Sequence, residues 1–186
     1  MPDNDEIVDT ADQGDDPSAL STEQPGTAAP AFVGSFPDAV VTERSYASSD
    51  ATYRWIEVAV GDWVEIVRAA KEAGFDAFVD LYAVDHYAQA PRFEVGLNLV
   101  SMSTKERIIL STRVPYDDPS VPTVTGEFAG ANFYEREAYD LFGIIFPGHP
   151  DLTRILLPDD WDGHPLRKDY DIGAIPVQFK AGSADL

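Results

Sequence analysis

The chain has 186 residues, 44% of them hydrophobic and 11% aromatic, which is enough to bury the core of one domain of ordinary size. It contains no cysteine, so disulfides, thiolate zinc sites and cysteine-held iron–sulfur clusters are excluded. With 33 acidic and 13 basic side chains its formal net charge is −20, which disfavours binding to nucleic acid and a direct polybasic contact with anionic lipid. A partner with positive patches fits this charge better, although a need for solubility alone also produces an acidic excess.

Residues 1–30 carry eight acidic and no basic side chains, together with four prolines. A segment with so little aliphatic surface cannot offset the entropy of ordering, so we predict a disordered acidic tail, with order beginning near Phe36. No apolar run approaches the roughly 20 residues that span a bilayer, and the acidic start is unlike a secretory signal. We therefore expect an intracellular protein that is soluble by itself.

The first predicted elements are a strand and a helix. Residues 53–60 (YRWIEVAV) are rich in β-branched and aromatic residues, which is typical of a strand. Asp62 is expected to cap a helix, with Glu65 in the capping-box position and Gly74 as the C-terminal stop. The apolar stripe of this helix is expected to comprise Val64, Ile66, Val67 and Ala70.

Three more strands are predicted at 78–84, 93–101 and 107–114, the last two joined by a short polar turn into a hairpin. A second helix, over residues 132–142, is expected to end at Gly143.

Together these patterns predict one α+β domain over residues 36–146, with a mixed sheet of about four strands and two or more helices. Residues 147–186 are predicted to form an extended, loop-rich segment that docks on a partner and ends in a tail.

A dense stretch of charges and turn formers spans residues 135–170. On the second helix Arg136 and Asp140 lie four apart and are predicted to pair along one face. Glu137, Asp140 and His149 could instead form an acid–base or metal site. No metalloprotease helix, nucleophile elbow or nucleotide-phosphate loop accompanies them, so we favour a structural or interface role for His149.

The C-terminal half of this stretch has the residue types that dominate protein interfaces. Trp161 is an amphipathic anchor, and Arg167 beside Lys168 can grip a partner carboxylate. His164 is expected to shape the loop or contact a partner rather than bind a metal. Because the segment is too polar to form core, Arg167→Glu is expected to leave the free domain folded and to weaken docking.

The stretch contains the motifs 134–137 (YERE), 140–144 (DLFGI), 148–150 (GHP), 154–156 (RIL), 160–161 (DW) and 163–170 (GHPLRKDY). Upstream lie the motifs 78–81 (FVDL), 92–95 (RFEV), 113–115 (RVP) and 118–122 (DPSVP). Over residues 50–170 the chain resembles the NuoC family, one of the subunit families of proton-pumping NADH-quinone oxidoreductase, respiratory complex I.

The resemblance implies a subunit of the peripheral arm that binds no cofactor of its own and holds its neighbours in place. In that complex NADH is oxidised at FMN, iron–sulfur clusters relay the electrons, and a quinone is reduced with proton translocation. The implied partners are other peripheral-arm subunits, chiefly the one that forms the quinone site and those that bear the clusters. The implied location is peripheral, on the cytoplasmic side of the cell membrane, with membrane contact only through the assembled complex.

The resemblance also marks twelve residues as candidates for the partner interface or the signature of the family. They are Glu135, Arg136, Glu137, Asp140, Gly143, His149, Arg154, Trp161, His164, Arg167, Lys168 and Asp169.

Three alternatives stay open at this point. One is the equivalent subunit of a membrane-bound hydrogenase or a deazaflavin-dependent dehydrogenase. Another is a small free-standing hydrolase that uses Glu137, Asp140 and His149. The third is an adaptor unrelated to respiration.

Overall fold

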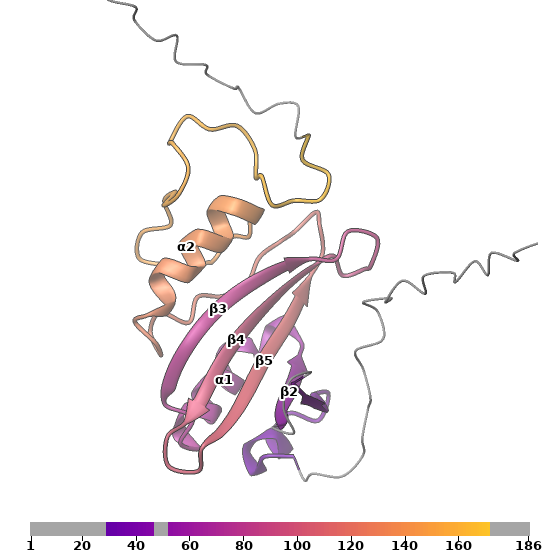
Figure 1. The fold of residues 1–186 in the computed structure, drawn as a ribbon, viewed down its shortest axis with the longest axis vertical. Coiled ribbons are helices and arrows are strands. Elements are labelled where there is room, and N and C mark those ends of the chain that lie inside the picture. The colour runs from indigo at the N-terminus through magenta and orange to yellow at the C-terminus, as the bar shows by residue number, and fades with distance from the viewer. Residues whose placement is uncertain (1–28, 47–51, 172–186) are drawn as a thin grey trace, which may run out of the picture.

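The computed structural model describes residues 29–46 and 52–171, which fold into a five-stranded sheet with helices packed beside it (Figure 1). The strands are β1 (Val40–Ser45), β2 (Thr52–Val58), β3 (Ala77–Asp85), β4 (Phe93–Ser101) and β5 (Glu106–Val114). The helices are α1 (Trp63–Glu72) and α2 (Ala131–Phe142), with two short 3₁₀ helices, η1 (Ala31–Ser35) and η2 (Val60–Asp62). The α+β class predicted from the sequence is confirmed.

The strand order across the sheet is β1-β2-β5-β4-β3, with β2 and β5 parallel and the other neighbouring pairs antiparallel. The sheet is therefore mixed, as predicted, and the hairpin of β4 and β5 is confirmed. The sequence predicted about four strands and missed β1, whose residues VVTERS are mostly polar. As an edge strand that pairs only with β2, β1 can carry charged side chains without burying them.

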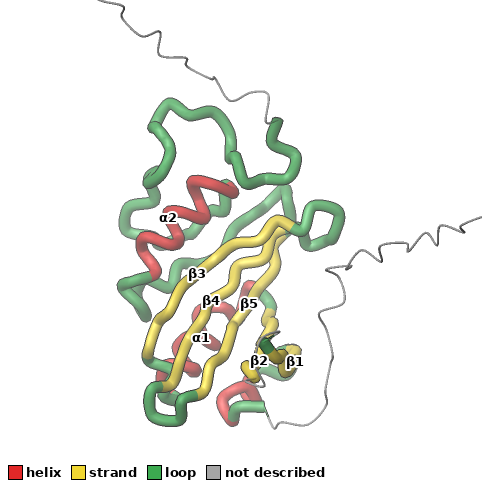
Figure 2. Tube along the Cα trace, in the orientation of Figure 1, coloured by secondary structure: helices red, strands yellow, loops and turns green. Residues whose placement is uncertain are grey.

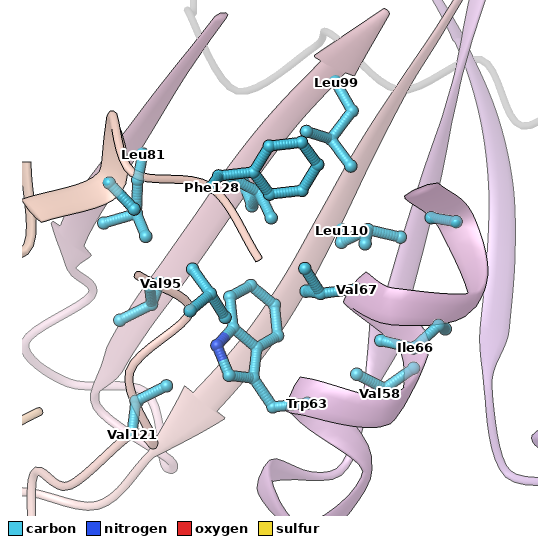
Figure 3. Close-up of a cluster of buried hydrophobic side chains, with 14 of the residues drawn as sticks. Val58, Trp63, Ile66, Val67, Leu81, Val95, Leu99, Leu110, Val121 and Phe128 are labelled. Atoms are coloured by element: carbon cyan, nitrogen blue, oxygen red, sulfur yellow. The ribbon is translucent and has the colours of Figure 1, made fainter. Parts of the chain in front are cut away.

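The hydrophobic core lies between the sheet and α1. This helix completely buries Trp63, Ile66 and Val67, and Figure 3 shows them facing side chains such as Val95 and Leu110 from the central strands. Each such side chain contributes roughly 1.5–3 kcal/mol when fully buried. The predicted apolar face of α1 is thus its core face.

The predicted capping box at the start of α1 is wrong. Asp62 makes no side-chain hydrogen bond to the helix, because it belongs to η2 and already has near-helical backbone angles of φ −95° and ψ −3°. A capping side chain needs the extended backbone that turns its oxygen toward the first free N–H groups. Glu65 lies 3.0 Å from Arg68 instead. The predicted stop is confirmed, since Gly74 follows α1 with φ +95°.

No described helix covers the opposite face of the sheet, which we call the open face. Figure 2 shows α1 behind the strands and α2 beside the edge strand β3. The open face is closely packed at its centre, where the ring of Tyr82 lies over Gly96. A Cβ at residue 96 would come within 2.2 Å of that ring, so this position requires glycine.

The second helix leads into a long irregular segment. Tyr134 of α2 packs edge to face on Phe78 of β3, with 5.4 Å between the ring centroids. Residues 143–171 then form no helix or extended strand, which confirms the loop-rich C-terminal segment as far as it is described. The predicted acidic tail, apart from residues 29 and 30, and residues 172–186 lie outside the described residues. Within the described ranges no helix has the length and hydropathy to cross a membrane.

Candidate functional site

The centre of the candidate site is the buried carboxylate of Asp140, in the last turn of α2. Its Oδ2 atom accepts hydrogen bonds of 2.8–3.0 Å from the backbone N–H groups of Ile155, Leu156 and Leu157. Its Oδ1 atom lies 2.7 Å from Nη1 of Arg154. Burial raises the pKa of Asp140, but these donors outweigh burial and hold the pKa below its ordinary value. One ionised carboxylate thus fixes four consecutive loop residues.

Arg154 carries this bonding further along the loop. Its Nη2 atom donates to the carbonyl oxygens of Trp161 at 3.0 Å and Gly163 at 3.2 Å. Its Nη1 atom also reaches the carbonyl oxygen of Asp140 at 3.2 Å. A planar guanidinium with five donors in a fixed fork can join three chain segments in this way, which a lysine cannot.

The predicted pair of Arg136 with Asp140 is wrong. Arg136 instead donates to the carbonyl oxygens of Thr153 at 3.1 Å and Arg154 at 2.9 Å, and to the Thr153 hydroxyl at 3.1 Å. Asp140 is fully buried and takes its cation from the loop. The spacing of four residues gave only the local partner, whereas the observed one lies 14 residues away.

Basic side chains cover the carbonyl end of α2. Gly143 ends the helix as predicted, with φ +71°, and a Cβ there would lie 2.5 Å from Nε2 of His164. Nδ1 of His164 is 2.9 Å from the carbonyl oxygen of Asp140, and Nε of Arg167 donates to that of Phe142 at 2.6 Å. Burial lowers the pKa of His164, so the neutral ring donates Nδ1–H to the helix. Positive charge at a helix C-terminus is stabilising.

Arg167 therefore differs from its sequence prediction. Its guanidinium is not free for a partner but lies 5.2 Å from the ring of Phe93 and 5.4 Å from that of Tyr116. Its neighbour Lys168 has an exposed side chain, while the backbone N–H of Lys168 donates to Asp85 Oδ2 at 2.8 Å. We now expect substitution of Arg167 to affect the free domain.

A second clip holds the far end of the segment to the sheet. Arg92 lies between two carboxylates, bidentate to Asp85 at 2.8 and 2.7 Å and bidentate to Asp169 at 2.9 and 2.7 Å. The hydrogen bonds from Arg92 hold the pKa of Asp85 far below its ordinary value and also lower that of Asp169. Asp85 and Arg92 were not singled out from the sequence, because their role depends on a contact with a residue 77 positions away.

Glu135 holds α2 to the preceding irregular chain. It is fully buried, and its two carboxylate oxygens accept from Val124 N–H at 2.8 Å and from the Thr123 hydroxyl at 2.6 Å. Burial raises the pKa of Glu135 to about 7, against the lowering effect of these two hydrogen bonds. Glu135 is an internal strut of the domain.

The three residues of the hydrolase alternative are each used or placed separately. Asp140 is bonded as above. His149 has Nε2 at 3.2 Å from the Asn132 carbonyl oxygen and accepts at Nδ1 from Asp151 N–H at 3.0 Å. Glu137 is half-buried or less, on the outer side of α2. Within residues 29–46 and 52–171 no three His, Cys, Asp or Glu side chains gather as a metal site.

The bonded segment leaves apolar side chains on the surface beside α2. Phe133 and Leu156 are each 61% exposed, and with Tyr134, Glu137 and Ile155 they line a shallow pocket of about 300 Å³. We call these five residues the α2 platform. Figure 1 shows the loop segment, coloured orange to yellow, passing close to α2. Trp161, half-buried, has an indole N–H without a hydrogen-bond partner among the described residues.

Known proteins share this fold and signature. A family model described as the 30 Kd subunit of respiratory-chain NADH dehydrogenase matches residues 56–175. The NuoC-type subunit of NADH-quinone oxidoreductase from Roseiflexus sp. (strain RS-1) is 44% identical over 143 residues, which cover 77% of this chain and 82% of the relative.

Two solved structures extend the comparison. A trypsin-resistant fragment of Nqo5 is 37% identical with a TM-score of 0.51, covering 54% of this chain and 83% of the fragment. A chain of the membrane-bound sulfane sulfur reductase, an archaeal respiratory membrane complex, is 25% identical with a TM-score of 0.66, covering 76% of this chain and 82% of that one. With a family model over more than half its length, this chain belongs to the NuoC family, that of the 30 Kd subunit of the respiratory-chain NADH dehydrogenases.

Proposed function

We propose that this chain is a cofactor-free subunit in the peripheral arm of an NADH-quinone oxidoreductase, where it holds neighbouring subunits in position. Its neighbours are the subunit that forms the quinone site and the cluster-bearing subunits, on the cytoplasmic side of the membrane. In those neighbours electrons pass from NADH through FMN and iron–sulfur clusters to a quinone, coupled to proton translocation. Family membership supports the complex, and the chain's lack of cysteine supports the absence of a cluster ligand.

The observation that carries the positional role is the bonding of the signature segment to its own domain. Asp140, Arg154 and Arg136 hold loop backbone, and Arg92 holds Asp169, so most of the conspicuous charges are used internally. A loop fixed in this way keeps its shape without helix or strand. Such preorganisation lowers the entropy cost of binding and favours a precise docking surface.

The surface that this loop presents fits a protein partner. The α2 platform combines an exposed aromatic ring, two exposed aliphatic side chains and one carboxylate. Protein interfaces are typically apolar at the centre with a polar rim. We therefore place the docking contact at the platform rather than at Arg167, which is bonded to Phe142.

A second candidate is the equivalent subunit in a membrane complex with another electron donor. The similarity to a chain of the sulfane sulfur reductase complex favours this candidate as a real alternative. Both candidates share a positional role and differ in the protein that delivers electrons.

Purification of the tagged chain from its own membranes in mild detergent tests the proposal and separates the two candidates. We expect cluster-bearing and quinone-site subunits to co-purify together with an NADH-oxidising flavoprotein, and the preparation to reduce quinone with NADH. Co-purification of the same subunits without that flavoprotein would favour the second candidate. Recovery of the tagged chain alone under conditions that retain other membrane complexes would contradict both.

A further inference from the structure

One end of the open face carries a cluster of arginines and aromatic rings. Arg44 of β1 stacks over Trp55 of β2 with 3.8 Å between the guanidinium carbon and the ring centroid. Arg107 of β5 donates to the Tyr46 hydroxyl at 2.9 Å, and Tyr46 packs on Tyr53 with 4.9 Å between ring centroids. We call these five residues the arginine–aromatic cluster.

The two cations of this cluster have no carboxylate partner among the described residues. Neither Arg44 nor Arg107 forms an ion pair there, whereas Arg54, on the same strand as Trp55, lies 3.2 Å from Glu106. In a chain with a net charge of −20, two such arginines at one place are unusual. A guanidinium stacked on an aromatic ring keeps its N–H donors free at the ring edge for a carboxylate.

The chain itself supplies a segment of complementary charge. Residues 1–28 contain eight acidic and no basic side chains. This segment joins the described fold just before η1, whose Phe32 packs edge to face on Phe75 at 6.1 Å. Phe75 follows α1 next to Gly74, and the Cβ position of Gly74 lies 3.9 Å from Ser101 Oγ at the hairpin end of β4.

The attachment point and the cluster therefore lie at the same end of the sheet. Ser101 pairs with Glu106, and Arg107 pairs with Val100, in the register of β4 and β5. Arg44 pairs with Tyr53 at the corresponding end of β1 and β2. Eleven residues of extended chain reach about 36 Å, so acidic residues in the middle of the segment can reach the cluster.

We propose that residues 1–28 bind back onto the arginine–aromatic cluster and cover this end of the open face. The contact is electrostatic, with several carboxylates exchanging on two stacked guanidinium groups. It needs no ordered structure in the segment, because a short tether gives an effective concentration on the order of millimolar. The proposal concerns residues outside the α2 platform and does not depend on the function proposed above.

A spin label in the segment tests the contact in the full chain. Because the chain has no cysteine, Ser18→Cys provides a unique site for a nitroxide, close to Asp15 and Asp16. At about 0.01 M salt we expect the label to reduce at least about twofold the amide NMR signals of Arg44, Trp55 and Arg107. At about 1 M salt, where the Debye length falls from about 30 Å to about 3 Å, these signals should recover.

Two variants and a matched control make the test specific. Arg44→Gln with Arg107→Gln should abolish the signal loss, and replacing the eight acids by their amides should do so with the cluster intact. Arg68→Gln removes an exposed cation from α1, outside the open face, and should leave the signal loss unchanged. The proposal is overturned if the cluster signals are unaffected by the label at low salt, as expected if the cluster binds an acidic partner protein instead. Signal loss that persists in both charge variants would also overturn it.

Discussion

Replacing Asp140 by asparagine tests the centre of the site with almost no change in shape. The carboxylate accepts three backbone N–H bonds on Oδ2 and the Arg154 guanidinium on Oδ1. An asparagine has one oxygen and one NH₂ group. Whichever way it is turned, the NH₂ group meets donors, either the three backbone N–H groups or Arg154.

The size of the effect follows from burial. Asp140 is fully buried, and the side chain of Arg154 is only 16% exposed. Removing one partner of a buried ion pair costs about 3–5 kcal/mol, because the other charge stays buried without compensation. A domain of this size has about 5–15 kcal/mol of stability, so Asp140→Asn should fold but lose a large part of it.

Two measurements on the free chain report this loss. Urea unfolding gives the change in unfolding free energy, and hydrogen exchange reports the N–H groups of Ile155, Leu156 and Leu157 directly. We expect these three amides to lose most of their protection even if only the loop is released. Asp160→Asn is the matched control, since Asp160 is an exposed acid in the same loop and should change stability by less than about 0.5 kcal/mol. A cost below about 1 kcal/mol for Asp140→Asn, with unchanged exchange, would refute the central role of this carboxylate.

Three further predictions concern other parts of the domain. The pKa of Glu135, raised to about 7 in the fold, means that stability should fall as pH rises from about 4.5 to 7, since the folded state then binds more protons than the unfolded state. Compared with wild type, Glu135→Gln should remove a slope worth roughly 3 kcal/mol at most, as measured by urea unfolding at each pH, and identical pH profiles would contradict the assignment. Arg167→Met should cost the free domain about 1–3 kcal/mol in the same assay, through the bond to Phe142, whereas Lys168→Met should cost almost nothing; equal effects would argue for an external role of Arg167. Deleting residues 1–28 should move the thermal midpoint by less than the few degrees that about 1 kcal/mol produces, and a much larger shift would mean that they pack as core.

The fold was predictable where residue patterns repeat along a short stretch. The apolar face of α1 and the strands β2 to β5 follow from local periodicity, and Gly143 from the need for positive φ. The edge strand β1 was missed because a strand with one neighbour and an exposed face has little hydrophobic pattern to detect.

The site was predictable as a set of residues but not as a set of contacts. Sequence spacing offered Arg136 as the partner of Asp140, because only helix neighbours can be found by counting. The observed partner, Arg154, lies on a loop whose path depends on the bonds that it makes. Arg92 joins Asp85 to Asp169 across 77 positions, and no local pattern encodes such a distance.

The positional role predicts that assembly depends on the exposed side chains of the α2 platform rather than on charges already used inside the domain. Leu156→Asp places a charge on a side chain that is 61% exposed, so the free domain should keep its thermal midpoint. Burying a leucine at an interface contributes roughly 1.5–3 kcal/mol, so docking should weaken at least about tenfold. Met102→Asp, at a 72% exposed residue of the β4–β5 turn, is the matched control.

The most direct measurement is the yield of assembled complex on native gels, with NADH-driven quinone reduction, in membranes carrying either variant. We predict loss of both assembly and activity for Leu156→Asp and normal values for Met102→Asp. Full assembly and full activity with Leu156→Asp would contradict the docking role of the platform, and assembly without activity would place this residue nearer the chemistry than a positional role allows.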